Sequence, residues 1–284
     1  MLVLSTVDEL TSWLERHVKM HKTIGFVPTM GALHEGHLQL VKKSCRENNL
    51  TICSIFVNPT QFNDKNDLAK YPRTLENDCR LLKNTDLDVV FAPSTEEIYP
   101  RGFDIPIPDL NGLDSVMEGA FRPGHFKGVV QVVQRLLSMV RPDKLYMGQK
   151  DFQQFTIIAH VLKVTHSPVQ LVVCKTKREK NGLAMSSRNA RLSTDMKHKA
   201  GLIYRTLVAV KEQWGKKPPP VLSEYAIKRL QSEFLKPEYF TIADGHTLQP
   251  VHTFDKNQYV VACVAVWAEG VRLIDNMILS PDKK

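Results

Sequence analysis

The most informative segment of the chain is Pro28-Thr29-Met30-Gly31-Ala32-Leu33-His34-Glu35-Gly36-His37. It follows a short apolar run, Ile24-Gly25-Phe26-Val27, whose length and bulk are typical of a buried parallel strand. An amphipathic run from about Leu38 to Asn48 comes after it and predicts a helix. The stretch is therefore expected to form a strand-to-helix turn that carries two glycines and two histidines.

A turn of this kind binds anions readily, because backbone N–H groups and the positive end of the helix dipole point past the sheet edge. His34 and His37 are three residues apart, so both lie on one face of a helix that begins near them and can reach the same phosphate. Zinc is the alternative ligand for two such histidines. It needs at least a third ligand, and no cysteine–histidine cluster with ligand spacing supplies one.

The rest of the first 177 residues alternates strand and helix patterns. After an expected helix at 7–19 and the histidine turn, the expected strands are 50–57, 88–93, 144–147 and 169–174, and the expected helices are 75–83, 127–140 and one that follows Asp151. This alternation predicts a parallel sheet with helices on both faces. Ligands of such sheets bind beyond the carboxyl ends of the strands, where the histidine turn is expected to lie.

The pattern changes after residue 177. An expected helix at 195–214 is followed by a Pro-rich connection at 215–220, a further helix, and consecutive strands near 239–243, 258–267 and 271–278. We therefore expect an α/β fold in two parts. A Rossmann-like parallel-sheet domain over 1–177 holds the ligands, and a smaller α+β C-terminal domain over 178–284 forms a lid over the site.

The composition of the 284 residues excludes several classes of protein. Hydrophobic residues make up 43 % and charged residues 24 %, which is ordinary for a globular chain. No apolar stretch is long enough to span a bilayer, and the N-terminus lacks the pattern of a signal peptide. The five cysteines are scattered, which favours a cytoplasmic location. The net charge of +8 is spread along the chain without a continuous basic stripe, so we expect no nucleic acid and no membrane as partner.

Three further groups of polar residues follow predicted strands. Lys150 and Asp151 can reach phosphates and ribose hydroxyls, with Gln154 one turn on; a solvated helix N-terminus would explain the first two equally well. The segment 185–188 brings two hydroxyls and a guanidinium that can wrap a triphosphate, unless it is simply a polar loop. In the third group, Asn58 and Gln61 lie at the same sheet edge and offer neutral hydrogen bonds, although turn chemistry alone would also explain Asn58 before a proline.

Several long motifs, in order, resemble the pantoate–β-alanine ligase family within the H-x-G-H nucleotidylyltransferases. Besides the opening turn they are Phe56-Val57-Asn58-Pro59-Thr60-Gln61-Phe62, Tyr71-Pro72-Arg73-Thr74, the segment 118–126, Lys150-Asp151-Phe152-Gln153-Gln154, the segment 182–189 and Arg272-Leu273-Ile274-Asp275-Asn276. The resemblance spans nearly the whole chain. It implies an ATP-dependent ligase that joins pantoate to β-alanine through pantoyl adenylate and releases AMP and pyrophosphate. It also implies Mg²⁺ with the ATP co-substrate and a homodimer.

The resemblance also implies roles for residues at matching positions. His37, His34 and Lys150 are the implied catalytic residues, and Gln61, Gln154 and Asn58 the implied substrate-binding residues. The implied ATP-binding residues are Met30, Gly31, Ala32, Leu33, His34, Glu35, Gly36, His37, Gly148, Gln149, Lys150, Asp151, Lys177, Met185, Ser186, Ser187 and Arg188. The Mg²⁺ ligands are not fixed by the sequence, and Asp78 is only a candidate.

Two positions depart from the family pattern. Gln149 stands where the family usually has glutamate, and Lys177 stands where it commonly has valine. Another nucleotidylyltransferase is the nearest alternative, but a phosphate acceptor would call for more arginines than the neutral set of Asn58, Gln61 and Gln154 provides. H-x-G-H turns also occur in aminoacyl-tRNA synthetases. A nucleic-acid-binding module would, however, need an anticodon-type domain or a basic stripe, and the C-terminal part shows neither.

Overall fold

The computed structural model describes residues 1–18, 22–63, 65–102 and 104–282. Its larger sheet has six strands in the order β1-β4-β3-β2-β5-β6, and every neighbouring pair is parallel. The strands are β1 (Leu2–Leu4), β2 (Ile24–Thr29), β3 (Leu50–Ile55), β4 (Val89–Phe91), β5 (Lys144–Gly148) and β6 (Gln170–Cys174). The predicted parallel sheet is therefore confirmed, with β1 as an additional edge strand.

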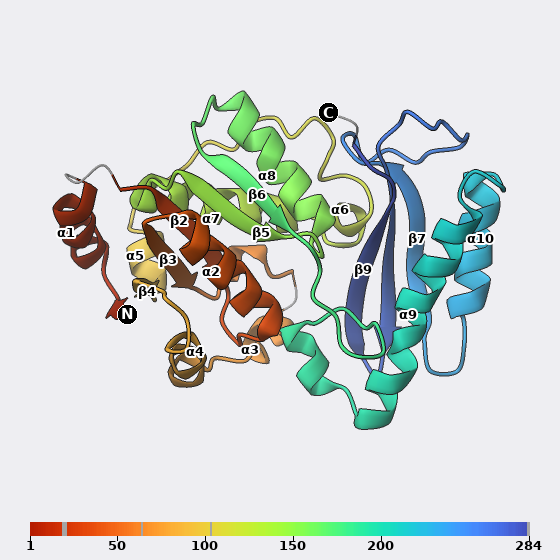
Figure 1. Ribbon diagram of the computed structural model, residues 1–284, viewed down its shortest axis with the longest axis horizontal. Coiled ribbons are helices and arrows are strands. Elements are labelled where there is room, and N and C mark those ends of the chain that lie inside the picture. Colours follow the sequence, from red (N-terminus) through yellow and green to blue (C-terminus); the bar gives the residue numbers. More distant parts are fainter. Residues whose placement is uncertain (19–21, 64, 103, 283–284) are drawn as a thin grey trace.

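Helices cover both faces of this sheet (Figure 1). The main ones are α1 (Val7–Val18), α2 (Glu35–Glu47), α4 (Leu75–Leu82), α7 (His125–Val140) and α8 (Phe152–Val164). Buried side chains of α1, α7 and α8 pack in one core, and those of α2 and α4 pack in another. The last residue of the helix expected at 7–19 lies outside the described residues. Four short elements occupy stretches for which no helix was expected: η1 (Pro59–Gln61), α3 (Lys65–Ala69), α5 (Thr95–Ile98) and α6 (Glu118–Phe121).

The remainder of the chain builds a three-stranded antiparallel sheet in the order β7-β8-β9. Its elements are η2 (Ser187–Arg191), α9 (Thr194–Gln213), α10 (Pro219–Leu230), β7 (Lys236–Asp244), β8 (Val260–Ala268) and β9 (Val271–Ser280). Val260, Ala262 and Val264 of β8 pack with α9 and α10, whereas Val261 and Cys263 pack in a core of the larger sheet. This alternation follows from the two-residue period of a strand. One face of the small sheet therefore packs against α9 and α10, and the other face packs against the core of the larger sheet.

The strand order places a ligand crevice between β2 and β5. The chain adds β3 and β4 on one side of β2 and then β5 and β6 on the other, so the direction of winding reverses between β2 and β5. Parallel sheets bind ligands outside the carboxyl ends of their strands at such a reversal. The histidine turn follows β2 and Gly148 ends β5, so both lie at this point. No helix within the described ranges is long and apolar enough to cross a membrane.

Candidate active site

A cavity of about 710 Å³ opens at this crevice, and residues of η2 and of the small sheet also line it. Most of the predicted site residues line it. They are Met30, His34, Gly36, His37, Asn58, Gln61, Gly148, Lys150, Asp151, Gln154, Lys177, Met185, Ser186, Ser187 and Arg188. Residues distant in the sequence are thus brought together from the turn after β2 and from α2, η1, β5, α8 and η2.

The shape of the histidine turn depends on Asp78 of α4. Gly31 and Ala32 have φ of +80° and +49°, in the left-handed region that costs energy for a residue with a side chain. The fully buried Asp78 carboxylate accepts the N–H groups of Ala32 at 2.9 Å and Leu33 at 2.8 Å, and the Thr74 hydroxyl at 3.2 Å. Both oxygens of the candidate Mg²⁺ ligand Asp78 are therefore engaged in holding the turn.

The two histidines cap the N-terminus of α2. His34 Nδ1 accepts the Gly36 N–H at 3.1 Å, and His37 Nδ1 accepts the His34 N–H at 3.3 Å. The ring centroids are 4.1 Å apart. A nitrogen that accepts a hydrogen bond carries no proton, so in the neutral imidazole the proton is on Nε2. Both rings therefore offer Nε2–H as a donor.

The surroundings keep both imidazoles neutral at pH 7. Burial, with a smaller contribution from the charge of Lys150, lowers the pKa of His34 to about 4. Burial, with the neighbouring His34, lowers the pKa of His37 to about 3. Two neutral donors at a helix N-terminus suit an anion whose charge increases during a reaction.

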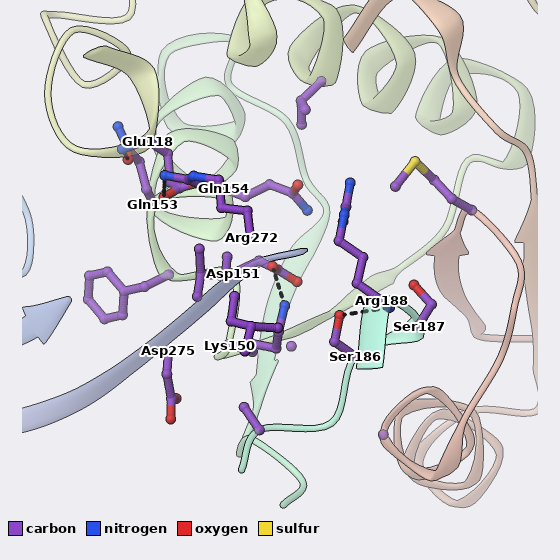
Figure 2. A pocket seen from close by; sticks show the side chains of 18 of the residues that line it. Glu118, Lys150, Asp151, Gln153, Gln154, Ser186, Ser187, Arg188, Arg272 and Asp275 are labelled. Atoms are coloured by element: carbon purple, nitrogen blue, oxygen red, sulfur yellow. Dashed lines mark hydrogen bonds and ion pairs between the residues drawn. The ribbon is translucent and has the colours of Figure 1, made fainter. Parts of the chain in front are cut away.

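Two cationic groups line the same cavity as the histidines. Lys150 comes from the turn after β5 and forms an ion pair with Asp151 at 3.2 Å. Arg188 of η2 forms an ion pair with Asp67 of α3 at 3.0 Å. Figure 2 shows Lys150, Gln154 and Arg188 reaching toward the same space from three different elements. The arrangement can hold a polyphosphate between two neutral donors and two cations.

Asn58 and Gln61 form one unit at the end of β3. The Asn58 side chain is 1 % exposed, and its Nδ2 donates to Gln61 Oε1 and to the Gly128 carbonyl, each at 3.1 Å. Its Oδ1 accepts the Tyr99 hydroxyl at 2.9 Å. Gln61 Nε2, 3.2 Å from Met30 Sδ, is left as the donor on the cavity side. Asn58 thus lines the cavity with an amide that already has its partners, and it orients Gln61.

Five of the predicted ATP-binding residues do not line the cavity: Gly31, Ala32, Leu33, Glu35 and Gln149. Ala32 and Leu33 give their N–H groups to Asp78, as described above. Glu35 is exposed. Gln149 lines a separate cavity between β6, α9 and β9, where its Nε2 donates to Asn276 Oδ1 at 3.4 Å.

A buried charge network at the back of the cavity had no predicted role. Glu118 of α6 accepts hydrogen bonds from Nη1 and Nη2 of Arg272 and from the Tyr239 hydroxyl, and Arg272 also pairs with Glu238. Figure 2 shows Glu118 beside Arg272. The only sequence signal for it was that Glu118 and Arg272 each belong to a family motif. No spacing along the chain links residues that are 154 positions apart.

Comparison with known proteins identifies the family. A model described as Pantoate-beta-alanine ligase matches residues 2–278. The chain belongs to this family. Among curated relatives of this ligase, the pantothenate synthetase of Azobacteroides pseudotrichonymphae genomovar. CFP2 is 47 % identical over 279 residues, covering 98 % of this chain and 99 % of the relative. That of Bacteroides thetaiotaomicron is 46 % identical over 283 residues, with 98 % of each chain covered.

Solved structures agree with the ligase fold. The pantothenate synthetase of Thermus thermophilus superposes with a TM-score of 0.90 at 39 % identity, covering 99 % of this chain and 100 % of that one. The pantoate-beta-alanine ligase of Francisella tularensis, solved as a complex with beta-gamma ATP and beta-alanine, gives a TM-score of 0.80 at 34 % identity over 98 % of both chains. The predicted family and the Rossmann-like fold with a small antiparallel domain are both confirmed.

Proposed function

We propose that the cavity between β2 and β5 is the place where this ligase joins pantoate to β-alanine. The enzyme condenses the two substrates to pantothenate with ATP as co-substrate, through a pantoyl adenylate, and releases AMP and pyrophosphate. The observation that carries the assignment of the site is the meeting of His34, His37, Lys150 and Arg188 around one cavity beside Gln61 and Gln154.

The first step transfers the adenylyl group to pantoate. A carboxylate oxygen attacks the α-phosphorus of ATP, the bond from this phosphorus to the bridging oxygen breaks, and pyrophosphate leaves. A carboxylate needs no base, so the enzyme has to stabilise the charge that develops on the phosphates. We assign this work to the Nε2–H groups of His34 and His37 and to the charges of Lys150 and Arg188. In this assignment His37 donates a hydrogen bond and is not a protonated acid, in accord with its lowered pKa.

The second step transfers the pantoyl group. The neutral amine of β-alanine attacks the acyl carbon, the bond from that carbon to the phosphate oxygen breaks, AMP leaves, and the new amide nitrogen loses one proton to solvent. We propose that Gln61, oriented by Asn58, and Gln154 hold the pantoyl group during both steps. Acyl adenylates hydrolyse readily, so the cavity has to exclude water. We propose that the smaller domain over 178–284 provides this cover as a lid on the domain over 1–177.

Mg²⁺ is proposed to enter with ATP. Within the described ranges, no group of three or more His, Cys, Asp or Glu side chains is arranged to hold a metal ion. Asp78 uses both carboxylate oxygens on backbone and hydroxyl donors. Mg²⁺ commonly binds through substrate phosphates with few protein carboxylates, and this fits the residues present. When bound, the ion would neutralise phosphate charge beside Lys150.

Two further properties are proposed from the family resemblance and from the cysteines. We propose that the ligase is a homodimer, which sedimentation at micromolar concentration tests directly. We also propose a cytoplasmic location. All five cysteines are free, and Cys53, Cys174 and Cys263 are buried, which is usual for a protein of a reducing compartment.

The assignment of the site is tested by measuring pyrophosphate with ATP, Mg²⁺ and pantoate, with β-alanine added last. We expect pyrophosphate to form only when pantoate is present, and pantothenate and AMP to follow when β-alanine is added. Lys150→Ala should slow pantoate-dependent pyrophosphate formation by about 10²- to 10³-fold, the usual loss for one stabilising group. A near-normal rate in this variant would remove Lys150 from its role.

A further inference from the structure

Strand β9 carries two adjacent polar residues, Asp275 and Asn276, that are 4 % and 2 % exposed. Buried polar side chains are stable only when they are hydrogen-bonded. Adjacent residues of a strand point to opposite faces, so the two side chains reach different neighbours. The partners of Asn276 lie in the turn that carries Lys150, and the side-chain partner of Asp275 is Arg178, which precedes the loop over 182–188.

Asn276 is bonded to the turn after β5. Its Nδ2 donates to the backbone carbonyl of Gln149 at 2.9 Å and to that of Lys150 at 2.8 Å. Its Oδ1 accepts the Gln149 side chain at 3.4 Å. The carbonyl groups of the turn that carries Lys150 therefore take their hydrogen bonds from the small sheet.

Asp275 is bonded to the loop that leads to η2. Its carboxylate receives both Nη atoms of Arg178, at 2.6 and 3.0 Å, and the Asn276 N–H at 2.8 Å. Arg178 also donates to the Gly182 carbonyl at 3.0 Å and lies over the Tyr204 ring at 4.3 Å. Through Arg178, Asp275 of β9 thus holds Gly182, the first residue of the loop over 182–188.

We propose that Asn276 is a positioning residue for the adenylyl transfer, because it sets the backbone from which Lys150 reaches the phosphates. The proposal rests on the proposed function, in which Lys150 contacts ATP. Together with Asp275, Asn276 places the Lys150 turn and the 182–188 loop in a fixed relation to each other. The residue acts through Lys150, since its side-chain amide is already bonded to the turn.

The expected effect of losing the Asn276 amide follows from this geometry. Two partly buried carbonyls would lose the donor that Asn276 supplies, and the turn would relax to find other partners. A displacement of about 1 Å at a catalytic group can cost on the order of 100-fold in rate. Gln61 and Gln154, which we assign to pantoate, lie on other elements, so the KM for pantoate should change little.

A double-mutant cycle tests the proposal on the full-length enzyme. The variants are Asn276→Ala, Lys150→Ala and the double variant, and the readout is the single-turnover rate of pantoate-dependent pyrophosphate release with enzyme in excess. We expect Asn276→Ala to lower this rate by about 10- to 100-fold, with the KM for pantoate within about twofold. In the Lys150→Ala background it should lower the rate by less than about twofold, because a residue that acts through Lys150 has no further effect.

Two controls separate positioning from folding. Ser280→Ala removes another buried polar side chain from β9, away from the site, and should leave the rate unchanged. Gln149→Ala removes only the third hydrogen bond of Asn276. This variant should lower the rate by a few-fold in the wild-type background and should have almost no effect in the Lys150→Ala background. It serves as the test if Asn276→Ala does not fold.

The outcomes are distinguishable. The positioning role is overturned if Lys150→Ala is slow and the effect of Asn276→Ala on the rate is the same in the wild-type and Lys150→Ala backgrounds. The same holds for Gln149→Ala where it takes the place of Asn276→Ala. This result leaves the proposed function intact. A raised pantoate KM with an unchanged rate overturns the positioning role as well. A wild-type rate for Lys150→Ala alone overturns the role of Lys150 in the proposed function and removes the basis of this inference.

Discussion

At the scale of single residues, the two histidines owe their chemistry to the backbone around them. Each Nδ1 accepts an N–H of the first turn of α2, which leaves each Nε2–H as a donor. Burial lowers both pKa values, so neither ring carries a charge at pH 7. His34 and His37 are therefore suited to stabilise developing negative charge as neutral donors.

Replacement of His37 tests this donor role. His37→Ala should lower the rate of pantoate-dependent pyrophosphate release by about 10²- to 10³-fold, the usual cost of one lost donor. His37→Gln keeps an amide N–H near the position of Nε2 and should retain at least about ten times the activity of His37→Ala, again on the scale of a single donor. Equal activity in the two variants would count against a donor role.

The lowered pKa values also predict a pH dependence of stability. The unfolded chain binds protons on these histidines below about pH 6.5, whereas in the folded protein His34 and His37 stay neutral down to about 4 and about 3. The unfolded state then binds more protons, so stability falls as pH drops from about 6.5 toward 4. A proton NMR titration of the nucleotide-free enzyme checks the premise: an apparent pKa near 6.5 for His37 would be the contrary result.

At the scale of elements, three polar contacts join α3 and the nearby Tyr71 to η2, which lines the cavity. Asp67 of α3 forms ion pairs with Arg188 at 3.0 Å and Arg191 at 3.4 Å. The hydroxyl of Tyr71, just after α3, lies 3.4 Å from Ser187 Oγ. The Asp67 carboxylate pairs with the Arg188 guanidinium, which we assign to ATP binding. The nucleotide and Asp67 of α3 therefore compete for this guanidinium.

Removal of the Asp67 charge should therefore favour ATP. We expect Asp67→Asn to lower the KM for ATP by about two- to fivefold, because a part-exposed ion pair contributes roughly 0.2–1 kcal/mol. Asp195→Asn breaks a more exposed pair with Lys199 on α9; neither residue lines the cavity, so this KM should stay unchanged. An increased KM for Asp67→Asn would mean that Asp67 orders Arg188 for the nucleotide and does not compete with it.

Long elements with a clear hydrophobic period could be predicted from the sequence. Strands β2, β3 and β5 and helix α7 lie within a few residues of their expected ranges. Short elements were missed: β1 has three residues at a sheet edge, and α3 and α6 have five and four, too few to show a period. These elements exist because distant partners hold them, such as Val89 and Val90 opposite Leu2 and Val3.

The candidate site likewise contains residues that could be predicted from the sequence and residues whose roles could not. Groups next to predicted strands, such as His34, His37 and Lys150, were recognised because strand ends collect at one edge. The roles of Asp78, Glu118 and Asn276 were not, because each acts on a partner 45 or more positions away in the sequence. Such pairings follow from tertiary packing and leave no local pattern.

At the scale of the whole molecule, the two sheets meet through a buried charge network as well as apolar contacts. Glu118 on the larger part pairs with Arg272 of β9 and accepts the Tyr239 hydroxyl of β7 at 2.8 Å. Burial raises the pKa of Glu118, but the hydrogen bonds and charge of Arg272 outweigh it and leave the pKa below its usual value. The network therefore holds β7 and β9 of the small sheet in place against α6 beside the cavity.

Loss of this carboxylate should destabilise the protein. Glu118→Gln leaves Arg272 with a weaker buried partner, and we expect a loss of roughly 3 kcal/mol in the free energy of unfolding, measured by denaturant titration at pH 7. The difference from wild type should persist above pH 4.5 and shrink as pH falls through the lowered pKa of Glu118. Glu224→Gln, which breaks an exposed pair with Lys228, should leave the unfolding midpoint unchanged; an equal effect of both variants would contradict the account.

The central claim is that the cavity holds the pantoate carboxylate against the α-phosphorus of ATP. The most direct measurement uses pantoate with ¹⁸O in both carboxylate oxygens, in a complete reaction with ATP, Mg²⁺ and β-alanine. We predict that one ¹⁸O per turnover appears in the phosphate of AMP and the other stays in the amide carbonyl of pantothenate. AMP without ¹⁸O would contradict the claim, because the carboxylate would then not have attacked that phosphorus.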